Sequence, residues 1–225
     1  EDKLVIEGLD GDADSYLAVN GGANGSVAVT DSSGVTVTNT VLGAPAPGQL
    51  LFRTLGGDDI VTVDNSAGLI ETPIHFEGGV GSDSLHLTGN TAVTTAEYTP
   101  GATNDSGTIV HSIAGGPTQT VSFTGLEPVL DNVAAGNLII NGTNGDNAIN
   151  YTAGPGGGIF GANLTGLVSV DAFETYEFSQ KTTLTLNGLA GSDTINLNNP
   201  STPTGLTGII VNGGDPTGSD TLIVN

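Results

Sequence analysis

The chain contains no cysteine, methionine or tryptophan, and it carries very little positive charge. Because cysteine is absent, disulfide bonds cannot contribute to its stability, although this absence is compatible with secretion. Lysine and arginine together number 3, against 24 acidic residues, and the formal net charge is −21. Nucleic acids and anionic membrane surfaces are bound through basic patches, so we expect neither as a partner.

Long hydrophobic runs are also missing from the sequence. No run approaches the roughly 20 apolar residues that span a membrane, so we expect no membrane insertion. The sequence opens on Glu1, with no secretory leader before the first strand-like residues. We therefore expect a processed or excised portion of a larger secreted protein, located outside the cell or on the cell surface.

Helical periodicity is nearly absent, because glycine or proline interrupts nearly every long window. The 36 glycines coexist with a hydrophobic content of 36%, a combination typical of many short strands joined by glycine turns. Alternating apolar residues predict strands from the start of the chain, for example at Leu4–Ile6, Leu17–Val19 and Leu50–Phe52. Residues 89–118 are polar and loop-rich, with weaker strand signals near 97–98 and 108–111. The sequence predicts an all-β fold.

One phrase recurs along the chain, and its clearest copy is LTLNGLAGSDTINLNN at residues 184–199. It consists of a strand, a glycine turn, an aspartate and a second strand. Three further good copies place Asp59, Asp83 and Asp220 where this copy has Asp193. A weaker copy has Asn147 at that position, and the weakest lies near the start of the chain. The chain is therefore a repeat protein.

A longer period is also visible. KLVIEGLDGD matches NLIINGTNGD at an offset of 134 residues (137 − 3), and LLFRTLGGDDIVTVDN matches LTLNGLAGSDTINLNN at the same offset (184 − 50). We interpret residues 1–136 as a first super-repeat and residues 137–225 as a second, incomplete one. We expect the two to form one continuous structure.

The finer spacing predicts a β-solenoid, similar to a parallel β-helix. Asp59 and Asp83 are 24 residues apart (83 − 59), and Asn147 and Asp193 are separated by about two such steps. A unit of about 23 residues has the size of one solenoid coil, which gives roughly ten coils in this chain. The alternative is a set of tandem β-sandwich domains, which the 134-residue offset alone permits.

The phrases GGVGSDSLH and GLAGSDTIN resemble the Gly/Asp-rich GGxGxD repeats of secreted bacterial RTX-type proteins. They are also similar to repeats in very large bacterial surface proteins, adhesins and filaments. In RTX arrays the nonapeptide recurs every nine residues, and its stacked turns bind calcium. Here the phrase occurs once per coil, so the RTX calcium arrangement is not carried over intact.

Calcium is nevertheless the cofactor that the aspartates favour, since it takes six to eight oxygen ligands and glycine turns offer carboxylates together with carbonyls. The alternative is that each aspartate caps turn N–H groups, a role that an uncharged asparagine such as Asn147 also fills. The candidate metal ligands are Asp10, Asp12, Asp14, Asp58, Asp59, Asp83, Asp193 and Asp220.

Catalysis is not expected. His75, His86 and His111 lie in separate segments outside any HExxH motif. A polysaccharide-degrading β-helix enzyme is the remote third alternative, because such enzymes need basic residues near their acidic substrates and this chain has few.

The sequence favours a structural subunit or segment of an extracellular bacterial fibre, filament or surface adhesin. Open β ends would let such a segment join further copies of itself head to tail. The second alternative is a calcium-dependent adhesin module that binds cell-surface carbohydrate. Aromatic side chains exposed in a groove would favour that alternative.

Overall fold

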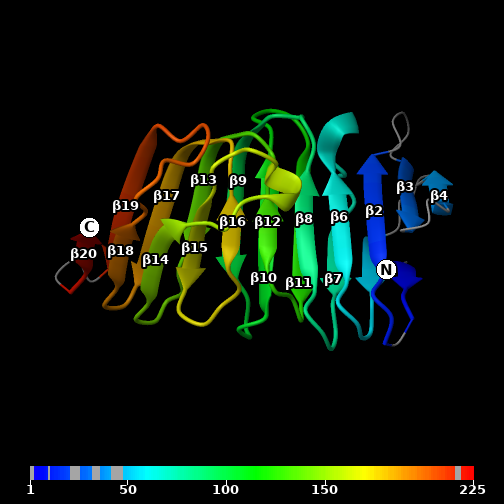
Figure 1. The fold of residues 1–225 in the computed structure, drawn as a ribbon, viewed down its shortest axis with the longest axis horizontal. Helices are drawn as coiled ribbons and strands as arrows, with labels where there is room; N and C mark the ends of the chain where they lie inside the picture. Colours follow the sequence, from blue (N-terminus) through cyan, green and yellow to red (C-terminus); the bar gives the residue numbers. More distant parts are fainter. Residues whose placement is uncertain (1–2, 10, 21–25, 32–35, 42–47, 216–218) are drawn as a thin grey trace.

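The computed structural model describes residues 3–9, 11–20, 26–31, 36–41, 48–215 and 219–225. The described residues form twenty strands and two short 3-10 helices, η1 (Asn65–Ala67) and η2 (Gly158–Phe160). The strands stand side by side in a row along the long axis of the molecule, with the N-terminus toward one end and the C-terminus toward the other (Figure 1). The prediction of an all-β fold is confirmed.

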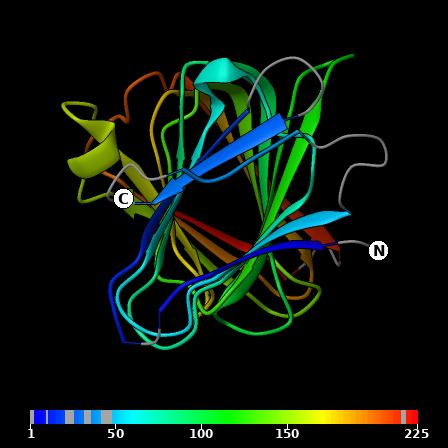
Figure 2. The ribbon, with the colours of Figure 1, turned by 90° about the vertical axis from the view of Figure 1, so that its right-hand side faces the viewer.

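The strands make two mixed sheets that face each other across a common core (Figure 2). The first sheet has nine strands in the order β1-β5-β7-β11-β10-β9-β13-β17-β19. Their bounds are β1 (Lys3–Glu7), β5 (Gln49–Arg53), β7 (Ile74–Glu77), β9 (Val93–Pro100), β10 (Ser106–Ser112), β11 (Thr118–Thr124), β13 (Ala135–Asn141), β17 (Lys181–Ala190) and β19 (Gly208–Asp215).

The second sheet has eleven strands in the order β20-β18-β14-β15-β16-β12-β8-β6-β2-β3-β4. Their bounds are β2 (Ser15–Asn20), β3 (Ser26–Asp31), β4 (Thr36–Val41), β6 (Ile60–Asp64), β8 (Ser84–Thr88), β12 (Val129–Asp131), β14 (Ala148–Ala153), β15 (Gly166–Val170), β16 (Tyr176–Phe178), β18 (Thr194–Asn198) and β20 (Thr221–Val224).

The chain crosses repeatedly from one sheet to the other. β5 pairs in parallel with β7, and β6 pairs in parallel with β8, so successive crossings lie directly beside one another. The same holds for β17 with β19 and for β18 with β20. All six copies of the repeated phrase form crossings from the first sheet to the second: β1–β2, β5–β6, β7–β8, β13–β14, β17–β18 and β19–β20.

This alternation is interrupted three times by an antiparallel excursion, in which three successive strands pair with one another in the same sheet before the chain crosses again. The sequence spacing did not predict these excursions. β9–β10–β11 fill three neighbouring places in the first sheet, and β14–β15–β16 fill three in the second. Each of these two excursions adds two strands to its sheet, so together they lengthen both sheets by the same number of strands. The β14–β15–β16 excursion also explains why Leu138 and Leu184, which are register partners, are 46 residues apart (184 − 138), whereas β5–β8 repeats after 24. The third excursion, β2–β3–β4, lies at the end of the second sheet.

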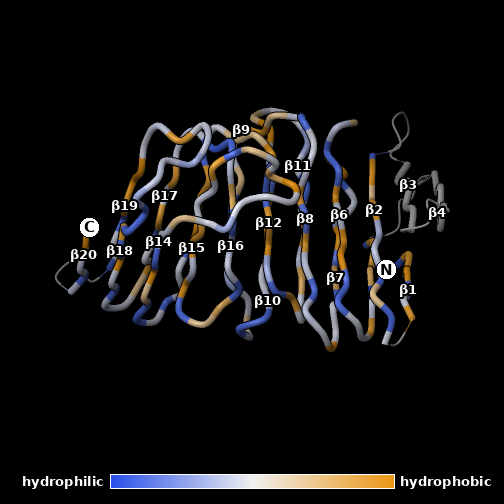
Figure 3. The backbone as a smooth tube through the Cα atoms, viewed as in Figure 1, coloured by the Kyte–Doolittle hydropathy of each residue, from blue (hydrophilic) through white to orange (hydrophobic). Residues whose placement is uncertain are grey.

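The core lies between the sheets and follows from the alternation of residues along each strand (Figure 3). Inward side chains stack in register from strand to strand, as Val61, Leu85, Val129 and Tyr176 do in the second sheet. These four side chains are fully buried. Residues 89–118, expected to be loop-rich, contain β9 and β10, and Tyr98 and Ile109 belong to the same core. Among the described residues, no helix has the length and hydrophobicity that crossing a membrane requires.

Candidate functional site: the turn aspartates and a buried polar cluster

The turns that carry the repeated phrase stack on one another along one edge of the molecule. The built position of a Cβ on Gly81 would lie 1.6 Å from the carbonyl oxygen of Gly57, and one on Gly57 would lie 1.9 Å from that of Asp12. Both glycines also have positive φ angles, 150° for Gly81 and 131° for Gly57. The phrase therefore needs glycine there because neighbouring turns approach backbone to backbone.

In four of the turns the aspartate accepts a backbone N–H from the neighbouring turn. Asp83 Oδ1 lies 2.9 Å from the amide nitrogen of Asp59, and Asp59 Oδ1 lies 2.6 Å from that of Asp14. In the second group of turns, Asp193 Oδ1 accepts from Asn147 at 2.9 Å, and Asp220 Oδ1 accepts from Asp193 at 3.0 Å. We call these side chains the aspartate ladder: Asp14, Asp59, Asp83, Asn147, Asp193 and Asp220.

The second carboxylate oxygen of three ladder residues is buried without a hydrogen-bond partner: Oδ2 of Asp59, Asp83 and Asp193. In two of them this oxygen lies against a glycine of its own turn, since a Cβ on Gly78 would come within 2.6 Å of Asp83 Oδ2, and one on Gly188 within 2.3 Å of Asp193 Oδ2. Burial, reinforced by the neighbouring charge of Asp59, raises the pKa of Asp83 to about 6. Burial also raises the pKa of Asp193.

The predicted metal ligands that the structure describes lie in two groups of turns. Asp14, Asp59 and Asp83 adjoin one another in one group of turns, and Asp193 and Asp220 adjoin in the other. Asp58 caps the amide of Ser82 at 2.9 Å and so belongs to the same turns without joining the ladder. Asp12 lies beside Gly57, and Asp10 lies outside the described residues.

The fit of calcium to these turns is limited by their geometry. Within the described ranges, no three acidic or histidine side chains converge on one point where a metal ion could sit. A turn in these ranges offers at most one unpartnered buried carboxylate oxygen, as at Asp59, Asp83 and Asp193, whereas calcium takes six to eight oxygens. What the turns do in this conformation is bind backbone N–H groups, and calcium at the aspartates stays a prediction.

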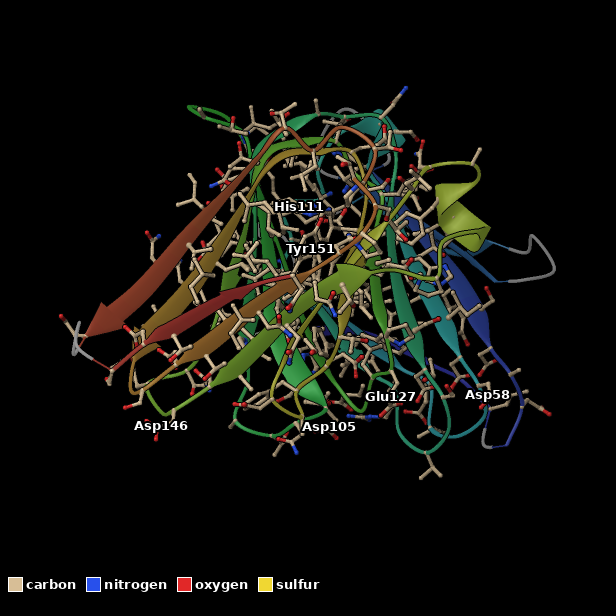
Figure 4. All side chains as sticks on the ribbon, turned by 60° about the vertical axis from the view of Figure 1, so that its left-hand side comes forward. Asp58, Asp105, His111, Glu127, Asp146 and Tyr151 are labelled. Atoms are coloured by element: carbon tan, nitrogen blue, oxygen red, sulfur yellow. The ribbon has the colours of Figure 1, made fainter. Side chains whose placement is uncertain are left out.

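A second polar group lies inside the core, between the sheets, and sequence reasoning missed it. Asp131 of β12, Lys181 of β17, His111 of β10 and Tyr176 of β16 are all buried. Asp131 contacts the other three side chains, with Lys181 Nζ 3.0 Å from its Oδ1. The available signal was an acidic residue on the inward side of the strand sequence VLD, since Val129 and Asp131 have the same parity. In Figure 4, His111 lies between the sheets, while Asp58, Asp105, Glu127 and Asp146 lie along the edge where the turns are.

The described aromatic side chains belong mainly to the core, and Tyr151 also lines a hollow described below. All four tyrosines, Tyr16, Tyr98, Tyr151 and Tyr176, are buried in the core. A hollow of about 300 Å³ beside β19 is lined mainly by polar and small residues, among them Asn199, Ser201 and Thr207. The hollow has no titratable side chain besides Tyr151 in its lining.

The outward histidines are separate from both groups. His86 is half-buried between the fully buried Leu85 and Leu87, as the alternation of its strand predicts. His75 Nδ1 lies 2.8 Å from the hydroxyl oxygen of Ser122 on the outer face of the first sheet. No family model, curated protein or solved structure matches this chain.

Proposed function

We propose that this chain is a two-sheeted β-solenoid segment with a structural role in an extracellular bacterial fibre or surface adhesin. We further propose that it joins other copies of itself through the end of the ladder formed by β19 and β20. The role is non-enzymatic in this proposal. Parallel, in-register pairing between successive crossings supports the solenoid reading over tandem sandwich domains, whose sheets would end at a domain boundary.

The observation that carries the proposal is the exposed core at β19 and β20. Leu184 and Ile195, one strand further in, are at most 1% exposed. Their register partners Ile209 and Leu222 are 38% and 53% exposed. Inward positions are thus filled by apolar side chains that no described strand covers. Another strand pair added in parallel would bury them, as β19 and β20 bury Leu184 and Ile195.

Asparagine side chains on the outer face of the first sheet are also stacked in a way that further strands could extend. Asn187 Nδ2 donates to Asn141 Oδ1 at 2.9 Å, and Asn212 Nδ2 donates to Asn187 Oδ1 at 2.8 Å. Stacked amides of this kind extend by one bond with each added strand. The side-chain amides of Asn212 and its neighbours would therefore support further strands beyond β19.

The two sheets end differently at the N-terminal end of the molecule, and this difference limits how two copies can join. The first sheet ends there at β1, whereas the second sheet continues past β2 with the hairpin β3–β4. A second copy placed in register would bring its β1 beside β19 and its β2 beside β20. Its hairpin β3–β4 would then occupy places already taken by β20 and β18, so the hairpin must leave the sheet when the copies join.

The test is electron microscopy and sedimentation of the purified chain, with and without a calcium chelator. The proposal predicts filaments, and it predicts that Leu222→Lys abolishes them because a charge would be buried in the joint. Val80→Lys is the matched control, since Val80 is an exposed apolar residue in a turn far from β20. Filaments that dissolve on chelation would add calcium as a structural ligand.

A monodisperse wild-type chain under both conditions would overturn the polymer proposal. The apolar edge of β19 and β20 would then be covered by strands of the same longer chain. The carbohydrate-binding alternative is less favoured, because the tyrosines that would stack on sugar rings are buried in the core.

A further inference from the structure

Asp131 and Lys181 form a pair that is wholly enclosed by the protein. Both side chains are completely buried, and Lys181 Nζ lies 3.0 Å from Asp131 Oδ1. Lysine is seldom buried in this way, and this chain has only 3 lysine and arginine residues in total. The pair connects β12 of the second sheet with β17 of the first.

Every acceptor position of the Asp131 carboxyl group is used. Oδ1 also accepts the backbone N–H of Val133 at 2.9 Å. Oδ2 lies 3.1 Å from His111 Nε2 and 2.5 Å from the hydroxyl of Tyr176. The ammonium group of Lys181 in turn donates to the backbone carbonyl of Val133. The two carboxyl oxygens therefore differ: one faces the amine and a backbone donor, and the other faces two side chains that can donate protons.

We propose that Lys181 and Asp131 become joined by an intramolecular isopeptide bond between Nζ and Cγ. One proton passes from the ammonium group to the carboxyl group and comes to lie on Oδ2, which gives a neutral amine and a neutral acid. The nitrogen lone pair attacks Cγ, and the C–Oδ2 bond breaks. Oδ2 leaves as water with that proton and a second one, which His111 or Tyr176 donates and recovers from the nitrogen. The products are one amide and one water molecule, and no oxidant or other reactant is needed.

The surroundings supply most of what this reaction requires, while the lowered pKa of Asp131 opposes its protonation. Burial lowers the pKa of Lys181, although the charge of Asp131 opposes that change, and a lower pKa favours the nucleophilic neutral amine. The Val133 N–H is placed to stabilise the negative charge that develops on Oδ1 during attack. Exclusion of bulk water favours the amide over hydrolysis, and the fixed contact replaces a bimolecular encounter.

His111 and Tyr176 are the groups that would protonate the leaving oxygen. His111 Nδ1 is buried and has no hydrogen-bond partner, so Nε2, which faces Asp131, is the ring nitrogen placed to donate a proton there. Tyr176 donates its hydroxyl hydrogen to the same oxygen. Both side chains touch the reacting carboxyl group, and they do so from strands of opposite sheets.

Trypsin gives a direct test, because the chain has so few cleavage sites. The sites are Lys3, Arg53 and Lys181, and acylation of Lys181 blocks cleavage there. For the wild-type protein, digested after denaturation, we expect a peptide that begins at Thr54, runs past residue 181, and is lighter than its sequence by one water molecule. Fragment ions should locate the loss to a branch joining residues 131 and 181. Two separate peptides at full mass, one ending at residue 181 and the other beginning at residue 182, would overturn the proposal.

Three variants sharpen the test. Lys181→Arg restores cleavage and full mass, because a guanidinium group does not attack a carboxyl group under these conditions. Asp131→Ala does the same, and His111→Phe leaves a mixture of linked and unlinked chains. A Lys181→Arg protein that is still lighter by one water would assign the loss to another site and contradict the proposal. The wild-type peptide map decides the question even where a variant fails to fold.

Discussion

Asp83 and Asp131 are both fully buried carboxylates, but they differ in their hydrogen-bond partners and in the direction of their pKa shifts. Asp83 uses one oxygen to accept the amide N–H of Asp59, while its other oxygen has no partner. Asp131 has partners for both oxygens, including the ammonium group of Lys181. As a result, burial raises the pKa of Asp83 to about 6, whereas Lys181 and His111 outweigh the effect of burial and hold the pKa of Asp131 below its usual range.

The difference follows from where the two residues lie. Asp83 belongs to a turn at the edge, where a backbone amide of the next turn is its partner. An uncharged acceptor stands at the equivalent position of another turn, where Asn147 Oδ1 accepts the N–H of Thr143 within its own turn at 2.7 Å. Asp131 lies in the core, where a charge is tolerated only with a counter-charge and a full set of hydrogen bonds.

The largest expected effect is at the core pair. Lys181→Met keeps most of the side-chain volume but leaves Asp131 buried without its ammonium partner, and it also prevents the proposed isopeptide bond. Removing one member of a buried ion pair alone costs about 3–5 kcal/mol, and we expect a loss of at least that size in the free energy of unfolding. Urea denaturation followed by circular dichroism would measure it. Lys3→Met is the control, because Lys3 is exposed and its loss should change stability by less than about 0.5 kcal/mol. Equal stability of the two variants would remove the distinction between core and edge.

An intermediate effect is expected at the aspartate ladder. Asp83→Ala leaves the buried amide of Asp59 without an acceptor, which costs about 1–3 kcal/mol. Asp83→Asn keeps an acceptor oxygen and should cost less than half as much. The same denaturation experiment checks both, with the exposed Asp105→Ala as the control. If Asp83→Asn were as damaging as Asp83→Ala, the carboxylate charge itself would matter, as a bound cation would require.

The smallest expected effect is a dependence of stability on pH. The pKa of Asp83 in the folded chain is about 6, above its ordinary value of 3.8, so the folded state holds this proton more tightly than the unfolded state. The stabilising contribution is fully present below the ordinary value and is lost as the pH rises through about 6. Glu174, whose pKa burial raises to about 7, acts in the same direction.

We therefore expect the melting temperature to fall between pH 5 and pH 8, and to fall less in Asp83→Asn. As long as Asp131 is not linked to Lys181, its contribution has the opposite sign, because its lowered pKa gives a contribution that is lost only in strong acid. A melting temperature that rises between pH 5 and pH 8 would contradict the raised pKa values of Asp83 and Glu174.

Local steric and hydrogen-bonding rules made much of this structure predictable. The phrase around Asp193 specifies a strand, a turn and a second strand, and six copies of it form six crossings between the sheets. The glycines of the phrase are required by positive φ angles and by close backbone contact, as at Gly81. The alternation of apolar residues was enough to place Leu85 inside and His86 outside.

The antiparallel excursions were not predictable in the same way. β9 and β10 lie in a polar stretch, and whether a chain turns back within one sheet or crosses to the other depends on which neighbouring strand is free to pair. The register of β11 beside β7 and of β13 beside β9 is a property of the assembled sheet. The spacing of the aspartates gives only the number of residues between two crossings, and it does not show which sheet the intervening strands join.

The sequence by itself determined the all-β fold, the crossing turns and the inward side of each strand, because these depend on interactions within a few residues. Only the tertiary structure decided that His111, Asp131, Tyr176 and Lys181 meet at one point. Those residues come from four strands in two sheets, and nothing in their local sequence fixes how far apart the strands will lie. Their contact depends on how the two excursions set the strand order, and strand order is decided by long-range pairing.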